Sequence, residues 1–148
     1  MRAAPFINRN KYLFAVITAS AVIMLIIFGL FRIDNSTNLM IIEYLNGLGW
    51  QIEENPTEIS HLTIPTDFDA VYQTYNAMQK ASGFNLEDFK GKSVTRYSYR
   101  VLNHQSSAST EVVASIFVYG NTIIAGDISS VEDNGFMHPV SDTSYITP

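Results

Sequence analysis

The hydrophobic pattern of the chain begins with an uncharged run of twenty residues from Tyr12 to Phe31, YLFAVITASAVIMLIIFGLF. At a rise of 1.5 Å per residue, a helix of this length spans about 30 Å, the thickness of the hydrocarbon core of a bilayer. A buried core helix would show a polar face, which this run lacks. No small-residue cleavage pattern and no cysteine follow it. We therefore expect an uncleaved transmembrane helix over residues 12–31 rather than a signal peptide.

Basic residues flank this run unequally. Arg2, Arg9 and Lys11 precede it, whereas Arg32 is the only basic residue among the twenty that follow. Since basic residues remain on the cytoplasmic side, we expect a single-pass protein of the cell membrane with its C-terminal part exported. The expected parts are a cytoplasmic N-terminus (1–11), the transmembrane helix (12–31), a connector (32–36), an extracytoplasmic α+β domain (37–140) and a loose C-terminal tail (141–148).

Two stretches of the exported part repeat apolar residues with the period of an amphipathic helix. The first runs from Thr37 to Leu48, and Gly49 can adopt the left-handed conformation that ends it. The second begins at a predicted N-cap, Thr66, and ends before Gly83. We expect its apolar stripe to pack on a sheet; the stripe consists of Phe68, Val71, Tyr72, Tyr75 and Met78.

Alternating apolar and polar residues predict strands over 50–54, 58–64, 95–101, 111–119 and 122–130. Gly120-Asn121 separates the last two and is typical of a two-residue hairpin turn. Residues 136–139 offer a short apolar return. The order is α-β-β-α-β-β-β, with hairpins in place of crossovers. We therefore predict an α+β fold in which an antiparallel sheet has its helices packed on one face, behind one N-terminal transmembrane helix.

Charge limits the possible partners. The whole chain has nine basic and fourteen acidic residues, a net charge of −5. Four of the basic residues lie at or before Arg32, so the exported part carries five basic residues against fourteen acidic ones, a net charge of −9. Such a body is repelled by nucleic acid, which we exclude as a partner. The chain has no cysteine, so disulfides and thiolate metal sites are excluded as well.

Asp127 and His138 form the first candidate site. Asp127 follows Gly126, a residue that kinks a strand or allows another group to approach its backbone closely. His138 comes eleven positions later, past a turn, so the chain can fold back and bring the two side chains together. The carboxylate would then raise the pKa of the imidazole. The pair can be interpreted as a structural tie or, with Ser129 or Ser130, as a hydrolytic triad, although no Gly-x-Ser-x-Gly motif supports a triad.

Arg96 and several tyrosines are the other candidates for binding. Arg96 projects from its predicted strand on the face opposite Tyr97, a pattern typical of a solvated or ion-paired residue. The tyrosines either line a groove for a peptide or glycan or fill the core between sheet and helix; they are Tyr72, Tyr75, Tyr97 and Tyr99.

Metal binding has little support in the sequence. His61, His104 and His138 are too scattered for a zinc signature, and the acidic pairs lack the ligand spacing of a calcium-binding loop. We expect no metal and no cofactor.

Several short motifs are spread over the region from Leu39 to Val140. They are Tyr44-Leu45-x-x-Leu48-Gly49-Trp50, Ile64-Pro65-x-x-Phe68-Asp69-x-Val71-Tyr72-x-x-Tyr75-Asn76-x-x-Gln79, Phe84-x-Leu86, Gly91-Lys92, Arg96-Tyr97-x-Tyr99, Gly126-Asp127 and Gly135-Phe136-Met137-His138. This set resembles a bacterial domain of unknown function that occurs in Gram-positive bacteria as a small exported module behind one membrane anchor. The resemblance implies a fold unit and a location, with no activity or catalytic residues to transfer. Where it implies a cysteine after Gly-Asp, this chain has Ile128-Ser129-Ser130.

These observations favour a membrane-tethered extracytoplasmic binding or interaction module of the bacterial cell envelope. Its partner would be an envelope protein or a cell-wall component. The alternatives are a membrane-proximal, hydrolase-like enzyme that uses Asp127 and His138 or acidic residues, and a structural subunit of a larger membrane assembly. An enzyme predicts that Asp127 and His138 converge in a pocket, whereas a binding module predicts a shallow surface.

Overall fold

A computed structural model of the chain describes residues 35–132 and 134–147. The predicted cytoplasmic segment (1–11) and transmembrane helix (12–31) lie outside these residues. Among the helices that the structure describes, none is long and apolar enough to cross a membrane. The sheet and its helix α2 belong to the compact unit Asn38–Pro148.

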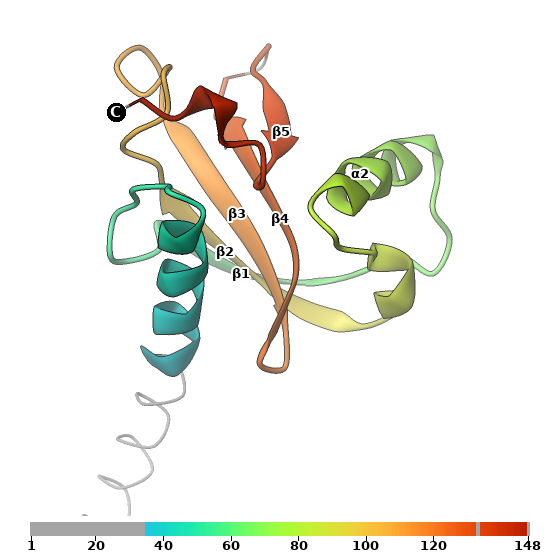
Figure 1. Cartoon of the computed structure of the whole chain (residues 1–148). Coiled ribbons are helices and arrows are strands. Elements are labelled where there is room, and N and C mark those ends of the chain that lie inside the picture. Colours follow the sequence, from blue (N-terminus) through green and yellow to red (C-terminus); the bar gives the residue numbers. More distant parts are fainter. Residues whose placement is uncertain (1–34, 133, 148) are drawn as a thin grey trace, which may run out of the picture. The chain divides into compact units, whose positions relative to one another are not determined.

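Five antiparallel strands form one sheet, and their spatial order is their order in the chain (Figure 1). The strands are β1 (Glu58–Thr63), β2 (Ser93–Arg100), β3 (Val112–Tyr119), β4 (Thr122–Ser130) and β5 (Met137–Pro139). The predicted turn at Gly120-Asn121 joins β3 to β4, and Gly120 takes the positive φ of +60° that this turn requires. The predicted α+β class with an antiparallel sheet is confirmed.

The strand predicted over 50–54 does not form. Ile52 makes only an isolated bridge with Val101. Two backbone hydrogen bonds support this bridge, from the amide of Glu53 to the carbonyl of Arg100 and from the amide of Leu102 to the carbonyl of Gln51. On the N-terminal side of the bridge a side chain takes over, because Asn103 accepts a hydrogen bond from the amide of Gln51 and donates one to the carbonyl of Gly49, each 2.9 Å long. The fifth strand of the sheet is β5, which the sequence indicated only as a short apolar return.

The described part of the chain contains two α-helices, one over residues 35–47 and α2 (Ala70–Ala81), and two 3-10 helices, η1 (Leu86–Phe89) and η2 (Thr143–Tyr145). Helix α2 begins later than predicted. Its N-cap is Asp69 rather than Thr66, and the Asp69 side chain accepts a 2.8 Å hydrogen bond from the amide of Tyr72. It ends before Gly83, as predicted, and this glycine has a φ of +82°.

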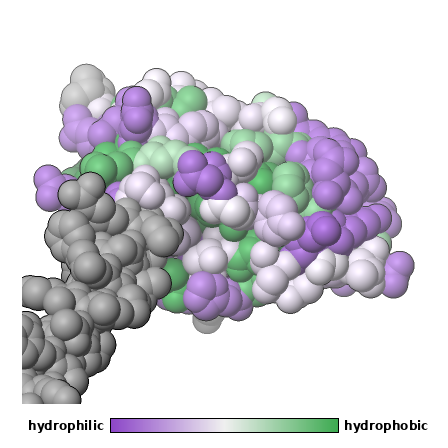
Figure 2. All heavy atoms as spheres, turned by 90° about the horizontal axis from the view of Figure 1, so that it is seen from below, coloured by the Kyte–Doolittle hydropathy of each residue, from purple (hydrophilic) through white to green (hydrophobic). Residues whose placement is uncertain are grey.

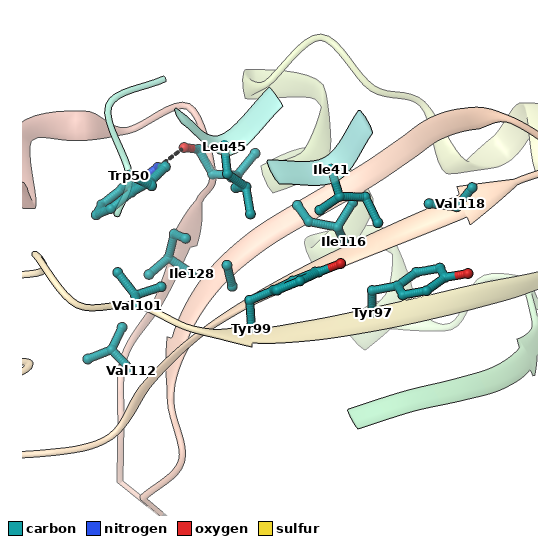
Figure 3. Close-up of a cluster of buried hydrophobic side chains, with 12 residues drawn as sticks. Ile41, Leu45, Trp50, Tyr97, Tyr99, Val101, Val112, Ile116, Val118 and Ile128 are labelled. Carbon is teal, nitrogen blue, oxygen red and sulfur yellow. Dashed lines mark hydrogen bonds between the residues drawn. The ribbon is translucent and has the colours of Figure 1, made fainter. Parts of the chain in front are cut away.

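The larger hydrophobic cluster lies between the helix over residues 35–47 and one face of the sheet (Figure 3). Ile41 and Leu45 of the helix point toward this face, which presents Tyr99 of β2. At one end of the cluster, the indole N–H of Trp50 donates a 2.8 Å hydrogen bond to the carbonyl of Val140. The buried members are Ile41, Leu45, Trp50, Tyr97, Tyr99, Val101, Val112, Ala114, Ile116, Val118, Ile128 and Val140.

Helix α2 contacts the opposite face of the sheet, so the prediction that the helices pack on one face is wrong. Tyr75 of α2 packs against Phe117, with ring centroids 6.3 Å apart, and Phe117 alternates along β3 with Ile116 of the larger cluster. The side-chain oxygen of Gln79 also accepts a 2.8 Å hydrogen bond from the amide of Gly126. Since β5 pairs only with residues 127–129 of β4, this amide is left for α2 to bind. The helix therefore follows the edge of β4 where β5 ends.

The buried side of α2 is not its predicted apolar stripe. Asn76 and Gln79 are its buried residues, whereas Val71 is 76% exposed. Polar side chains are buried here because they bind backbone groups: Asn76 accepts a 2.8 Å hydrogen bond from the amide of Leu86, as Gln79 does from β4. Of the predicted stripe, Phe68 and Tyr75 do pack against the sheet, and Tyr72 and Met78 are half-buried.

The C-terminal segment is attached to the domain, in contrast to the predicted loose tail. Ile146 forms an isolated β-bridge with His104, and the amide of Thr147 donates a 2.8 Å hydrogen bond to the carbonyl of Asn103. Tyr145 stacks on His104, with ring centroids 5.5 Å apart. The residues from 141 onward show no periodic pattern of their own. Ring stacking and backbone hydrogen bonds with Asn103 and His104 hold them on the domain.

Candidate functional site

A cavity of about 860 Å³ opens between α2 and the sheet face that carries Phe117. On the sheet side, its polar lining consists of Arg96, Ser115, Asp127 and Ser129, and Thr74 lines it from α2. Sheet geometry brings the residues on the sheet side together. Ser115 lies directly opposite Asp127 in the β3–β4 pairing, and Asp127 and Ser129 are two positions apart on β4, so they project from the same face. Two of the predicted candidates, Arg96 and Asp127, therefore share one site.

Asp127 is the buried carboxylate of this cavity. Only 3% of the residue is exposed, and the hydroxyl of Tyr75 donates a 2.7 Å hydrogen bond to its Oδ2. Burial raises the pKa of Asp127 to about 6, although hydrogen bonds from Tyr75 and Ser129 and the charge of Arg96 favour the ionised form. Burial is also the main reason why the pKa of Tyr75 is raised, so this hydroxyl remains a proton donor. The cavity thus contains an acid whose charge is poorly solvated.

Arg96 is ion-paired, one of its two predicted states. Its Nη2 lies 3.0 Å from Oε1 of Glu58, and the two side chains are 35% and 56% exposed. A pair this exposed contributes at most about 1 kcal/mol. The Nε of Arg96 is buried and lacks a hydrogen-bond partner within the described residues. The charge of Arg96 is thus balanced by Glu58, and one donor of the guanidinium remains available.

Asp127 and His138 do not meet, contrary to the prediction. In the β4–β5 pairing, Asp127 lies opposite Pro139 and His138 lies opposite Ile128. Since successive residues of a strand project to opposite faces, the carboxylate points to the cavity and the imidazole to the larger hydrophobic cluster. The two groups therefore cannot act together as members of a triad with Ser129.

His138 contacts a different residue, His104. Their Nε2 atoms are 3.4 Å apart and their rings are stacked. The amide of Ser106 donates to Nδ1 of His104, and Nδ1 of His138 lies 3.0 Å from the carbonyl of Pro139. These neighbours assign the neutral tautomers, so that His104 donates through Nε2 to Nε2 of His138. Burial and the neighbouring His138 lower the pKa of His104.

His61, the third histidine, lies apart from the His104–His138 pair. The sequence had suggested that all three histidines are separate. His61 of β1 contacts Thr95 of β2, with 3.1 Å between Nδ1 and Oγ1. Over residues 35–132 and 134–147, no three His, Asp or Glu side chains gather in a way that could hold a metal ion.

The tyrosines divide between the two alternatives that the sequence left open. Tyr72 and Tyr75 line the cavity, whereas Tyr97 and Tyr99 belong to the larger hydrophobic cluster. Sequence reasoning missed Phe117, Ser115 and Met137 as parts of the site. Their only signal is that they share a sheet face with Asp127, and this depends on a strand register that the sequence did not reveal.

The outer surface offers a weaker candidate than the cavity. On the face seen in Figure 2, hydrophobic residues occur in several separate areas among hydrophilic ones. The exposed large apolar residues in the described part of the chain are Leu39, Ile59, Val71, Leu102, Tyr119, Val131 and Met137. Val71 and Met137 are the two that also line the cavity.

The model of one protein family matches residues 44–128, more than half of the chain. This family is described as a domain of unknown function, DUF4830. The chain belongs to this family. The match contains α2, the first three strands and most of β4, including Arg96 and Asp127. No curated protein and no solved structure matches the chain. DUF4830 has no activity in its description, so the function must be argued from the cavity.

Proposed function

We propose that this DUF4830 protein is a membrane-tethered extracytoplasmic binding module of the bacterial cell envelope, and that the cavity over Asp127 is its binding site. The observation that carries the proposal is the cavity of about 860 Å³ with a buried carboxylate. Ligand sites in proteins measure about 300–1,000 Å³ and combine apolar walls with a few polar groups. Aromatic and methionine side chains supply the walls here.

Recognition fits this cavity better than hydrolysis. The enzyme alternative requires Asp127 and His138 to converge, and they lie on opposite faces of the sheet. The polar groups that do converge include a carboxylate, an arginine donor and two serine hydroxyls, which suit a ligand that is held by hydrogen bonds and charge. The site is a cavity of about 860 Å³ rather than the shallow surface expected of a binding module, which favours a small ligand or a single inserted side chain over a flat protein contact.

The membrane tether in this proposal rests on the apolar run over residues 12–31 and on the basic residues before it. Protease added to intact wall-less cells should remove the domain and spare the N-terminus. Protection of the C-terminal domain under conditions that cleave a known exported protein would contradict the proposed orientation.

Site-specific photo-crosslinking in host cells tests the binding site. A photoreactive amino acid at Met78 or Ser129, which line the cavity, should capture a discrete ligand or partner. The same probe at the exposed Glu111 should not capture it. Equal products from all three positions, or none from the cavity positions, would contradict the proposed site.

A further inference from the structure

Three aromatic rings in mutual contact line the same cavity as the carboxylate of Asp127. Tyr72 and Tyr75 meet edge to face, and so do Tyr75 and Phe117, each pair with ring centroids 6.3 Å apart. The middle ring of the three is the one whose hydroxyl binds Asp127. All four side chains line the cavity.

We propose that the cavity binds an ammonium group carried on an apolar stem, as in an alkylamine or a lysine-like side chain. This inference rests on the proposed function and names its ligand class. The faces of aromatic rings attract cations, most strongly where the cation has left water. A poorly solvated carboxylate beside these rings supplies the opposite charge and accepts hydrogen bonds from the ammonium group.

The charges near the cavity favour a cation despite the presence of Arg96. Glu58 lies 3.0 Å from Arg96 and balances it, whereas Asp127 has no ion-pair partner within 4 Å among the described residues. These three groups sum to a net charge of −1. The exported part as a whole carries −9, which attracts cations from a distance and repels anions. The free Nε of Arg96 can still donate to an uncharged acceptor on the ligand.

The remaining walls fit the stem of such a ligand. Met78, Val71 and Met137 line the same cavity. Val71 and Met137 are 76% and 54% exposed, so they lie on the solvent side, whereas Asp127 is buried. A methylene chain can therefore contact apolar side chains near the entrance while its ammonium group reaches the carboxylate inside.

The test is a titration of the full chain in lipid nanodiscs at pH 8 with three probes of equal length, n-butylammonium, 1-butanol and butyrate. Methionine methyl groups labelled with ¹³C report binding, because Met78 and Met137 line the cavity and Met40 does not. We expect n-butylammonium to shift the Met78 and Met137 signals and to bind at least tenfold more tightly than 1-butanol. Butyrate should bind more weakly still.

Two pairs of variants test the residues named. Asp127→Asn should lower the affinity for n-butylammonium to that for 1-butanol, whereas Glu111→Gln, which makes the same charge change at an exposed site, should leave it within twofold. Tyr72→Leu should weaken binding several-fold, and Tyr72→Phe should retain it. The methionine methyl spectrum shows whether each variant is folded.

Failure of this inference is distinguishable from failure of the proposed function. Binding of 1-butanol or butyrate as tight as that of n-butylammonium, no shift at Met78 and Met137, or an unchanged affinity in Asp127→Asn would overturn the ammonium assignment. If photo-crosslinking from the cavity still captures a ligand, the binding function survives with a different ligand class. If crosslinking also fails, both proposals fall.

Discussion

The hydroxyl of Tyr75 donates a 2.7 Å hydrogen bond to Asp127 and so joins α2 to β4 across the wall of the cavity. The same helix is joined to β4 a second time by the hydrogen bond between Gln79 and the amide of Gly126. Because Tyr75 and Gln79 are four positions apart, both lie on one side of α2. The apolar pattern identified Tyr75 on this side of the helix but not Gln79. The two hydrogen bonds hold α2 against β4 beside the cavity.

Removal of the Tyr75 hydroxyl should destabilise the domain. We expect Tyr75→Phe to lower the free energy of unfolding by about 1–3 kcal/mol at pH 8, because a hydrogen bond to a buried ionised carboxylate is lost. Urea denaturation measures the change. Tyr72→Phe, which removes a hydroxyl from a more exposed ring of the same helix, is the control. Equal effects of the two substitutions would contradict the assigned role of the Tyr75–Asp127 bond.

Neutralisation of Asp127 should stabilise the domain at high pH. The pKa of Asp127 is raised from 3.8 to about 6, so the folded state holds this proton more tightly than the unfolded state. The contribution of Asp127 to stability is therefore greatest below pH 4 and decreases as the pH rises to 6. We expect the stability of Asp127→Asn relative to the unaltered protein to increase by about 2 kcal/mol between pH 4 and pH 7.5.

Urea unfolding of both proteins across this pH range checks the prediction. A pH-independent difference would show that Asp127 has an ordinary pKa.

The histidine pair should make the C-terminal attachment sensitive to acid. The pKa of His104 is lowered by burial and by His138. This group contributes its full stability above its unfolded pKa of about 6.5, and the contribution decreases as the pH falls below that value. In His104→Asn, an amide oxygen can still accept the hydrogen bond from Ser106, but the side chain at position 104 no longer titrates. Thermal unfolding from pH 7 to pH 5 should therefore show a smaller loss for His104→Asn than for the unaltered protein.

Nuclear magnetic resonance provides a direct check of the same pair. At neutral pH, His104 should carry its proton on Nε2 and His138 on Nδ1, as their hydrogen bonds require. The opposite tautomer at either ring would contradict the hydrogen-bond chain.

Gly126 should not tolerate a side chain. A Cβ atom at this position would lie 2.8 Å from Cδ1 of Ile116 and 3.1 Å from Cγ1 of Val140. We expect Gly126→Ala to lower the free energy of unfolding by about 1–3 kcal/mol through overpacking. Ile116→Val removes the nearer atom, so the double variant should lose less stability than the sum of the two single variants. Strict additivity in urea denaturation would show that the predicted clash is absent.

The sheet was largely predictable because its signals are local. Gly120-Asn121 marks the β3–β4 hairpin, and alternation over Thr95 to Val101 marks β2. The close backbone approach at Gly126 was also expected from its position. The strand over 50–54 is reduced to a single bridge, and on one side of this bridge the side chain of Asn103, about fifty residues away, binds the Gln51 amide and the Gly49 carbonyl.

The candidate site was predicted only in part, for a similar reason. Asp127 and Arg96 were identified from chemistry, and both line the cavity. The prediction that His138 meets Asp127 was wrong. A shift of one residue in the β4–β5 register changes the sheet face to which His138 points, and the turn after β4 sets that register. The inward side of α2 was missed because Asn76 and Gln79 are buried through hydrogen bonds to backbone, which an apolar pattern does not report.

The chain order of the strands has a consequence for how the domain assembles. The β3–β4 hairpin closes through a two-residue turn and needs no distant contact, so we expect it to form early. Helix α2 lies in the chain between β1 and β2 and is bonded to β4, the third strand after it. We therefore expect the cavity to be completed late, after the transition state for folding. A bound ligand should accordingly leave the folding rate almost unchanged and slow unfolding, so that an occupied domain resists proteolysis longer than an empty one.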